Sequence, residues 1–274
     1  NSDYSNNYTG LKNCYLVFNA NYNEDCAYSV SINNSKDCID GSYIEKCELC
    51  YEGFMLTGCS HSLFSSRCEN SFNLIFCDSC KGCNDCFGSV GLRNKQYYIF
   101  NKPYSKKEYH RKLQEWNLGS HTTLQKLKME AREFFLRFPN KFMDGVNNTN
   151  VSGEYIYHSK NVADSYLIRE GENLRYCQGA LFPKTKDSYD YSIWGDNTEL
   201  AYESAVCGMG ASRIKFCHEC WQEVQDMEYS SYCGSGSNLF GCVGLRKKKY
   251  CILNKQYTQA EYEALVQKII QQMN

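Results

Sequence analysis

The stretch CFGSVGLRNKQYYIFNKPYSKKEY, residues 86–109, aligns without a gap on LFGCVGLRKKKYCILNKQYTQAEY, residues 239–262, and 14 of the 24 positions are identical. Upstream of it, shorter blocks match in the same order: KNCYL with DSYLI, EDCAYS with ENLRYC, KDCIDGS with KDSYDYS, and ELCYEG with ELAYES. Self-similarity at a fixed period is the sequence mark of a repeat architecture. The 274-residue chain is therefore predicted to contain an internal duplication.

A shorter period runs inside each copy. The blocks recur about every 12 residues, and Cys59, Cys68, Cys77 and Cys86 follow one another nine residues apart. Each block is a short extended piece in which Tyr, Val, Ile, Phe or Cys alternates with polar residues, closed by turn-forming residues. Such short strands are stable only when neighbouring blocks stack. We predict a mainly β fold, a tandem duplicated β-solenoid (parallel β-helix-like), with two blocks per turn.

Helices are predicted after the two shared strands, KQYYIFNK and KKYCILNK. Ser105 with Glu108, and Thr258 with Glu261, have the spacing of a capping box at a helix N-terminus. We divide the chain into a first Cys/Tyr-rich array over 1–104, a helical insert over 105–145, a second array over 146–257 and a C-terminal amphipathic helix over 258–274. One apolar face of that last helix is expected to pack over the open end of the coil: Tyr262, Leu265, Val266, Ile269, Ile270 and Met273.

The cysteines allow two interpretations. Four thiolates spaced by three, or a CxxC pair beside a histidine, could bind zinc or an iron-sulfur cluster. However, the residues aligned with the run of four in the second copy are Ser230, Cys233, Gly236 and Leu239. Exchange with compact residues favours buried thiols stacked as a ladder inside a narrow coil, with no cofactor. The metal site remains the alternative, with the candidate ligands Cys77, Cys80, Cys83, Cys86, Cys217 and Cys220.

The charge of the chain is unevenly distributed. The net charge is -1, but residues 93–141 hold 12 Lys or Arg against 4 Glu. A second alternative is therefore nucleic-acid binding through this basic helical insert. The motif GLR followed by Lys occurs in both copies, so Arg93, Lys95, Arg246 and Lys248 are the predicted partner-binding residues.

Catalytic signatures are missing from the sequence. The 5 His residues follow no recognisable motif, and no GxSxG, HExxH, P-loop or dinucleotide fingerprint occurs. The sequence thus favours a non-catalytic rigid scaffold or binding module for an unknown protein, glycan or nucleic acid, with exposed Tyr as contact surface. It leaves the oligomeric state open. No apolar run is long enough to span a membrane, and NSDYSNNYTG is not a signal peptide. We expect a cytoplasmic protein that is part of a longer chain.

Five segments carry a resemblance to a known family: NCYLVFNANYNEDCAYS, SKDCIDGSYIEKCELCYE, CKGCNDCFGSVGLRNKQYYIFNK, SYDYSIWGDNTELAYES and NLFGCVGLRKKKYCILNKQYTQAEYE. Over nearly its whole length the chain resembles uncharacterised cysteine-rich repeat proteins of uncultured small-genome bacteria, often mislabelled caib/baif family protein. The resemblance implies a repeat fold, followed in longer relatives by cysteine-pair segments that look like zinc ribbons. It implies no activity. This chain has Ser, Leu, Ala or Tyr at several positions where such relatives have Cys.

Overall fold

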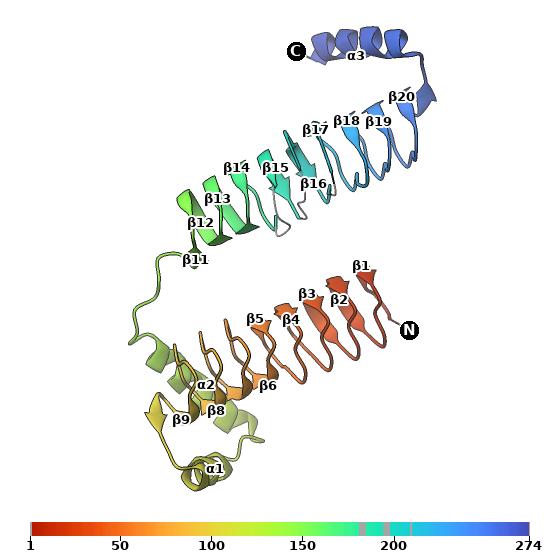
Figure 1. The fold of residues 1–274 in the computed structure, drawn as a ribbon. Coiled ribbons are helices and arrows are strands. Elements are labelled where there is room, and N and C mark those ends of the chain that lie inside the picture. Colours follow the sequence, from red (N-terminus) through yellow and green to blue (C-terminus); the bar gives the residue numbers. More distant parts are fainter. Residues whose placement is uncertain (1, 181–184, 194–197, 209, 274) are drawn as a thin grey trace. The chain divides into compact units, whose positions relative to one another are not determined.

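The computed structural model describes residues 2–180, 185–193, 198–208 and 210–273, and it divides into two compact units, Asn1–Asn140 and Lys141–Asn274. Each unit is a stack of coils whose short strands pair in parallel from one coil to the next (Figure 1). Helices follow the coils of each unit. The predicted fold class, a tandem β-solenoid with a helical insert and a C-terminal helix, is confirmed.

The strands of the first unit are mostly short, and each pairs with the strand one coil away. The last strand is antiparallel to its neighbour and closes the edge of the sheet. The strands are β1 (Asn6–Thr9), β2 (Tyr15–Asn21), β3 (Ala27–Asn33), β4 (Ser42–Glu45), β5 (Phe54–Thr57), β6 (Ser60–Leu63), β7 (Phe72–Ile75), β8 (Asn84–Phe87), β9 (Gln96–Ile99) and β10 (Lys102–Pro103).

The second unit repeats this arrangement and ends in the same way, with an antiparallel pair. Its strands are β11 (Gly145–Val146), β12 (Thr149–Tyr157), β13 (Lys160–Arg169), β14 (Glu172–Arg175), β15 (Lys186–Ser192), β16 (Tyr202–Ala205), β17 (Ile214–Lys215), β18 (Gln225–Glu228), β19 (Ser237–Phe240), β20 (Lys249–Ile252) and β21 (Lys255–Gln256).

One coil of the first unit is a single block long. Val30 pairs with Ser42, and Ser42 pairs with Phe54, so each block completes a full turn. The predicted two blocks per turn is therefore wrong. In the second unit some coils are slightly longer than a block, as the pairing of Leu174 with Ser188 and of Tyr189 with Tyr202 shows.

The tight coil results from a backbone turn at every third residue. From Asn13 to Phe100, every third residue has a positive φ between 45° and 68°. This left-handed conformation costs a residue other than glycine about 1–2 kcal/mol, and Asn and Asp tolerate it best. The residue after each turn points inward, and every third residue from Cys14 to Ser89 is buried. Each coil therefore has four inward positions, and its interior is narrower than that of the coil that was predicted.

The interior of one coil has room for few large side chains. The inward positions of one coil are Ile32, Ser35, Cys38 and Gly41, and the next coil begins with Ile44. A Cβ atom added to Gly41 would lie 2.4 Å from the Cδ1 atom of Ile44. One aliphatic side chain with small neighbours thus fills a coil, which explains the abundance of Cys, Ser and Gly.

In the described residues, three helices follow the coils: α1 (Lys106–Glu115), α2 (His121–Phe135) and α3 (Gln259–Met273). Both predicted capping boxes are confirmed. Glu108 accepts the Ser105 N–H at 3.0 Å, and Glu261 accepts the Thr258 N–H at 2.9 Å. Among the described residues, no helix combines the length and the hydrophobicity needed to cross a membrane.

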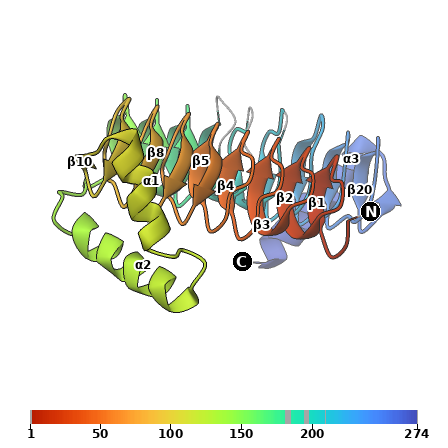
Figure 2. The same cartoon turned by 90° about the horizontal axis from the view of Figure 1, so that it is seen from below.

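Helix α3 packs against the last two coils of the second unit. Its buried Tyr262 lies against Phe240 and Ile252, which pair with each other in β19 and β20. The predicted C-terminal helix is thus confirmed, and β21 pairs antiparallel with β20 just before it. Helices α1 and α2 likewise lie beside the last coils of the first unit (Figure 2).

Candidate functional site

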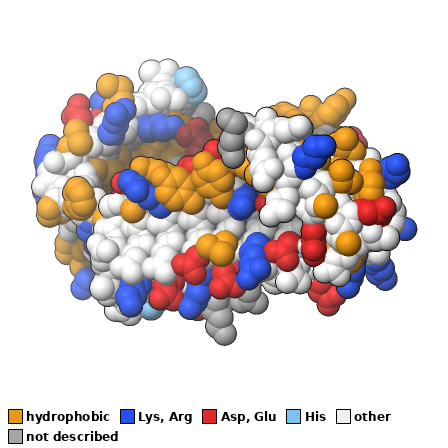
Figure 3. Space-filling view, turned by 90° about the horizontal axis from the view of Figure 1, so that it is seen from above, with side chains coloured by type: hydrophobic (Ala, Val, Ile, Leu, Met, Phe, Trp, Pro, Cys, Tyr) orange, Lys and Arg blue, Asp and Glu red, His pale blue; other side chains and the backbone are white. Residues whose placement is uncertain are grey.

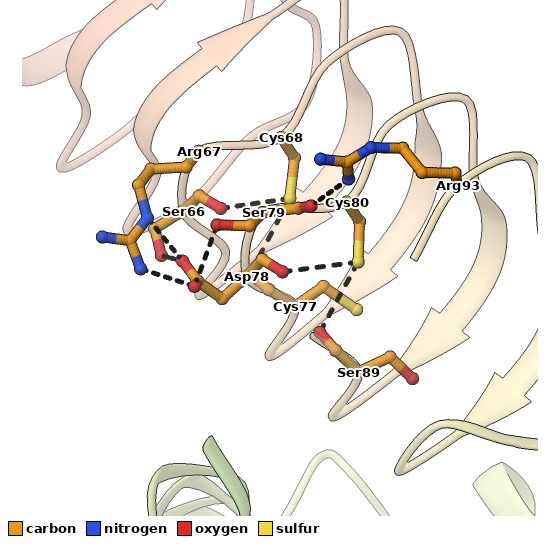
Figure 4. Close-up of polar contacts among 9 residues, drawn as sticks. All are labelled: Ser66, Arg67, Cys68, Cys77, Asp78, Ser79, Cys80, Ser89 and Arg93. Carbon is orange, nitrogen blue, oxygen red and sulfur yellow. Dashed lines mark hydrogen bonds and ion pairs between the residues drawn. The ribbon is translucent and has the colours of Figure 1, made fainter. Parts of the chain in front are cut away.

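The thiols form part of the packed interior. All 18 cysteines are buried and unbridged. Cys77, Cys80, Cys83 and Cys86 take four successive inward positions, so each enters the interior from a different side. The Cys80 thiol can donate to the carbonyl of Asp78 at 3.5 Å or to that of Ser89 at 3.6 Å (Figure 4).

The second candidate metal-binding pair, Cys217 and Cys220, also lies within hydrogen-bond distance of backbone carbonyls. The Cys217 thiol lies 3.2 Å from the carbonyl oxygen of Lys215, and the Cys220 thiol lies 3.3 Å from that of Ser230. Within the part of the chain that the structure describes, no group of three or more His, Cys, Asp or Glu is placed to hold a metal ion. Both thiols are placed to donate hydrogen bonds to backbone carbonyls.

Hydrogen bonds from neighbouring thiols lower the pKa of Cys80 and of Cys220, whereas burial acts in the opposite direction. Burial raises the pKa of Cys86 to about 12 and the pKa of Cys177 to about 11. Metal binding and nucleophilic attack both require the thiolate. At neutral pH the thiols of Cys86 and Cys177 are therefore protonated and poor nucleophiles and metal ligands.

Serine and cysteine side chains can accept the same kind of backbone hydrogen bond inside the coils. The Oγ atom of Ser65 accepts the Cys77 N–H at 3.1 Å, and the Oγ atom of Ser71 accepts the Cys83 N–H at 3.0 Å. These N–H groups point into the coil, so a small polar side chain one coil earlier is needed to satisfy them. This requirement explains why Cys and Ser replace each other between the two copies.

The four predicted partner-binding residues lie in the last coils of their own units. The Arg93 guanidinium donates to the carbonyl of Ser79 at 2.5 Å (Figure 4), while Arg246 pairs with Gly234 in the ladder. Lys95 and Lys248 continue the three-residue period of the inward positions, but their side chains are exposed. The shared motif therefore coincides with the place where the buried ladder stops.

Next to Arg93 lies an ion pair that sequence reasoning missed. The Asp78 carboxylate is buried, with 6% of the residue exposed, and the Arg67 guanidinium donates to it at 2.5 and 3.1 Å (Figure 4). Ser66 donates to the same carboxylate at 2.5 Å. Because these donors satisfy the carboxylate, the cluster ties neighbouring coils together and leaves no free acid or base.

One outer face of the first unit carries a row of rings, which we name the first aromatic column. Neighbouring rings lie in contact within two runs, Tyr4 to Tyr28 and Tyr51 to Phe100, for example Tyr15 with Tyr28 at 5.6 Å and Phe64 with Phe76 at 4.9 Å between centroids. These spacings are those of favourable aromatic pairs. The first aromatic column comprises Tyr4, Tyr15, Tyr28, Tyr51, Phe64, Phe76, Phe87 and Phe100.

Helices cover only one end of the first aromatic column. Trp116 lies 4.7 Å from Phe87, and Phe134 of α2 lies 5.3 Å from Phe100. Exposure changes accordingly, from 75% at Tyr4 and 56% at Tyr28 to 0% at Phe87. The part from Tyr4 to Tyr51 is open, and we name it the open part.

The second unit has an equivalent second aromatic column, formed by Tyr176, Tyr189, Tyr202, Phe216, Tyr229 and Phe240. Phe216 and Tyr229 stack at 4.6 Å, and the Arg175 guanidinium lies 4.8 Å from the Tyr176 ring centre. Helix α3 covers Phe240, whereas Tyr176, Tyr189, Tyr202 and Tyr229 are 37–42% exposed. On the face drawn in Figure 3, hydrophobic side chains gather in a band beside mixed rows of acidic and basic ones.

The sequence carries a weak signal for these columns. Their rings recur at nearly the period of the blocks, except between Tyr28 and Tyr51. The interval varies because some rings stand on a residue that pairs with the next coil, and others on the following residue, which has the positive φ of the turn. Exposed tyrosines were expected as a contact surface, but their alignment on one face was not. That alignment follows only from the coil length.

A scan against protein-family models and a search of curated proteins found no match. Among solved structures, a chain of Desulfovibrio desulfuricans G20 inferred to be an acetyltransferase matches 94% of this chain and 71% of its own, with 11% identity and a TM-score of 0.20. The polysialic acid O-acetyltransferase OatWY matches over 94% and 90%, with 8% identity and a TM-score of 0.08. At these values neither match bears on activity, and the fold rests on the strand pairing described above.

Proposed function

We propose that the chain is a non-catalytic repeat scaffold that binds a protein partner along its aromatic columns. The observation that carries the proposal is the partial covering of both columns: each runs on beyond the helix that packs on its end. Exposed rings that line up on one face offer a large contact area at little cost in side-chain entropy, and such patches mark interaction sites.

Three further features support a scaffold over an enzyme. The interior is filled by thiols, hydroxyls and aliphatic groups, and the buried Asp78 carboxylate is satisfied. Stacked coils held by backbone ladders give a stiff body whose partners contact the outer faces. The aromatic columns place rows of partly exposed rings on those faces.

The proposal is tested with the variant Tyr189→Ser/Tyr202→Ser in the second aromatic column. Its matched control is Tyr232→Ser, because Tyr232 is 54% exposed but lies outside the column. The immobilised wild-type chain is used to capture a protein from an extract of the source organism. That protein is purified and titrated against the wild type and both variants. We expect the column variant to weaken binding by about ten-fold or more and the control to leave it unchanged.

Equal affinity for the wild type and the column variant would overturn this function. So would binding only to DNA or RNA with a steep dependence on salt, since that result would favour the basic stretch 93–141. Glycan binding that depends on Tyr189 and Tyr202 would keep the column as the binding face but replace the class of partner.

A further inference from the structure

We propose that the open part of the first aromatic column binds an amphipathic helix of a partner, with basic side chains along its edge. The proposal rests on the function proposed above and names the partner's structure and charge. It is carried by helix α2 of this chain, which already lies on the same column.

Helix α2 shows how a helix sits on this face. Its Lys128 pairs with Glu52 at 2.5 Å, and its Phe134 contacts Phe100, which lies several coils further along. The helix therefore runs lengthwise over the column. Its Leu127 and Ala131 are buried among the rings.

The coil backbone continues unchanged into the open part, where Ile39 and Asp40 stand in place of a ring between Tyr28 and Tyr51. The left-handed turn recurs at every third residue on both sides of Glu52, so the backbone is the same under the covered and the open rings. Coils are about 4.8 Å apart, and side chains three or four apart on a helix are about 5–6 Å apart. Successive contacts of a helix can thus meet successive coils.

Charge indicates which kind of helix fits. Asp40 stands one coil before Glu52 at the same position of the repeat. Glu52 is paired with Lys128, whereas Asp40 is exposed and has no ion-pair partner among the described residues. Asp25 and Asp37 occupy the same turn of their coils as Tyr97 does in its own coil. In the covered part, Tyr97 packs against the helices. Carboxylates therefore flank the open rings. A basic side chain on a partner helix, placed one coil before Lys128, would lie next to Asp40.

The probe is a synthetic peptide of residues 120–136, which contains α2, held helical by a staple on its exposed face. Its affinity for the full chain is measured by fluorescence anisotropy at low and moderate salt. The control peptide reverses two charges, Lys126→Glu and Lys128→Glu. The protein variants are Tyr15→Ser/Tyr28→Ser and Asp40→Asn, with Glu45→Gln as control, because Glu45 is an exposed carboxylate outside the column.

We expect the tyrosine variant to weaken peptide binding by about ten-fold or more and Asp40→Asn to weaken it by about two- to five-fold. The Glu45→Gln variant should bind like the wild type, and the charge-reversed peptide should bind more weakly. Absent binding, or equal binding of both peptides, would overturn the inference. If a partner depends on Tyr15 and Tyr28 but contributes an extended segment or a glycan, the binding face stands and the helix is refuted.

Discussion

The Sγ atom of Cys47 accepts a hydrogen bond from the backbone N–H of Cys59, one coil further on, at 3.4 Å. In the preceding coil, the Oγ atom of Ser35 accepts the N–H of Cys47 itself at 3.2 Å. A thiol and a hydroxyl thus hold consecutive places in one chain of bonds. The ladder requires a compact acceptor at each place and does not require sulfur.

This equivalence predicts different results for two substitutions of Cys47. Cys47→Ser keeps an acceptor for the Cys59 N–H, so the free energy of unfolding should change little. Cys47→Ala leaves that buried N–H unpartnered, which costs about 1–3 kcal/mol. Urea unfolding of both variants measures the difference. Equal destabilisation by Ser and Ala would refute the role of the bond.

The narrow interior predicts a steric coupling between Gly41 and Ile44. Gly41→Ala places a methyl group 2.4 Å from the Cδ1 atom of Ile44, and overpacking of this kind costs about 1–3 kcal/mol. Ile44→Val removes the clashing atom, so the double variant should be more stable than the sum of the single changes indicates. A double-mutant cycle by urea unfolding gives the coupling, and strictly additive effects would contradict the packing described here.

Buried thiols make the fold sensitive to alkali. The pKa of Cys86 is raised from 9.0 to about 12 by burial, so this thiol stabilises the folded chain fully below pH 9, where it is protonated in both states. Above pH 9 the unfolded thiol ionises and the folded one does not, so stability falls as the pH rises towards 12. Cys177, with a pKa of about 11, acts in the same direction.

The measurement for this prediction is the urea midpoint between pH 7 and pH 11. We expect it to decrease above pH 9 in the wild type and to decrease less steeply in Cys86→Ser, because a serine hydroxyl does not ionise in this range. The same variant serves as its own control at pH 7. A midpoint that stays constant up to pH 11 would speak against protonated buried thiols.

Elemental analysis tests the alternative metal site. We expect protein purified without chelator or oxygen to contain zinc and iron well below one atom per chain, because the candidate thiols are committed to backbone carbonyls. Cys77→Ser/Cys80→Ser should then fold with an unchanged melting temperature. Stoichiometric metal that is lost in this variant would establish the alternative in place of the ladder.

The duplication, the capping boxes and the buried cysteines could be predicted because each leaves a direct mark in the sequence. The coil length could not, because the turn positions hold Tyr, Leu and Phe as well as Asn and Asp, for instance Leu16 and Tyr28 beside Asn19 and Asp25. The aromatic columns were missed for the same reason, since only a coil that closes after one block aligns their rings. Which rings are open depends on where α1, α2 and α3 pack, and that is decided by tertiary contacts.

The strict repeat of the first unit has an evolutionary consequence. Because each block closes one full turn in register with the next, copying a single block in the gene would insert a whole coil and leave every neighbouring contact intact. The slightly longer coils of the second unit show that imperfect copies are also accepted. Relatives of this chain can therefore differ in length by whole turns, and the surface they offer to a ligand would lengthen in equal steps.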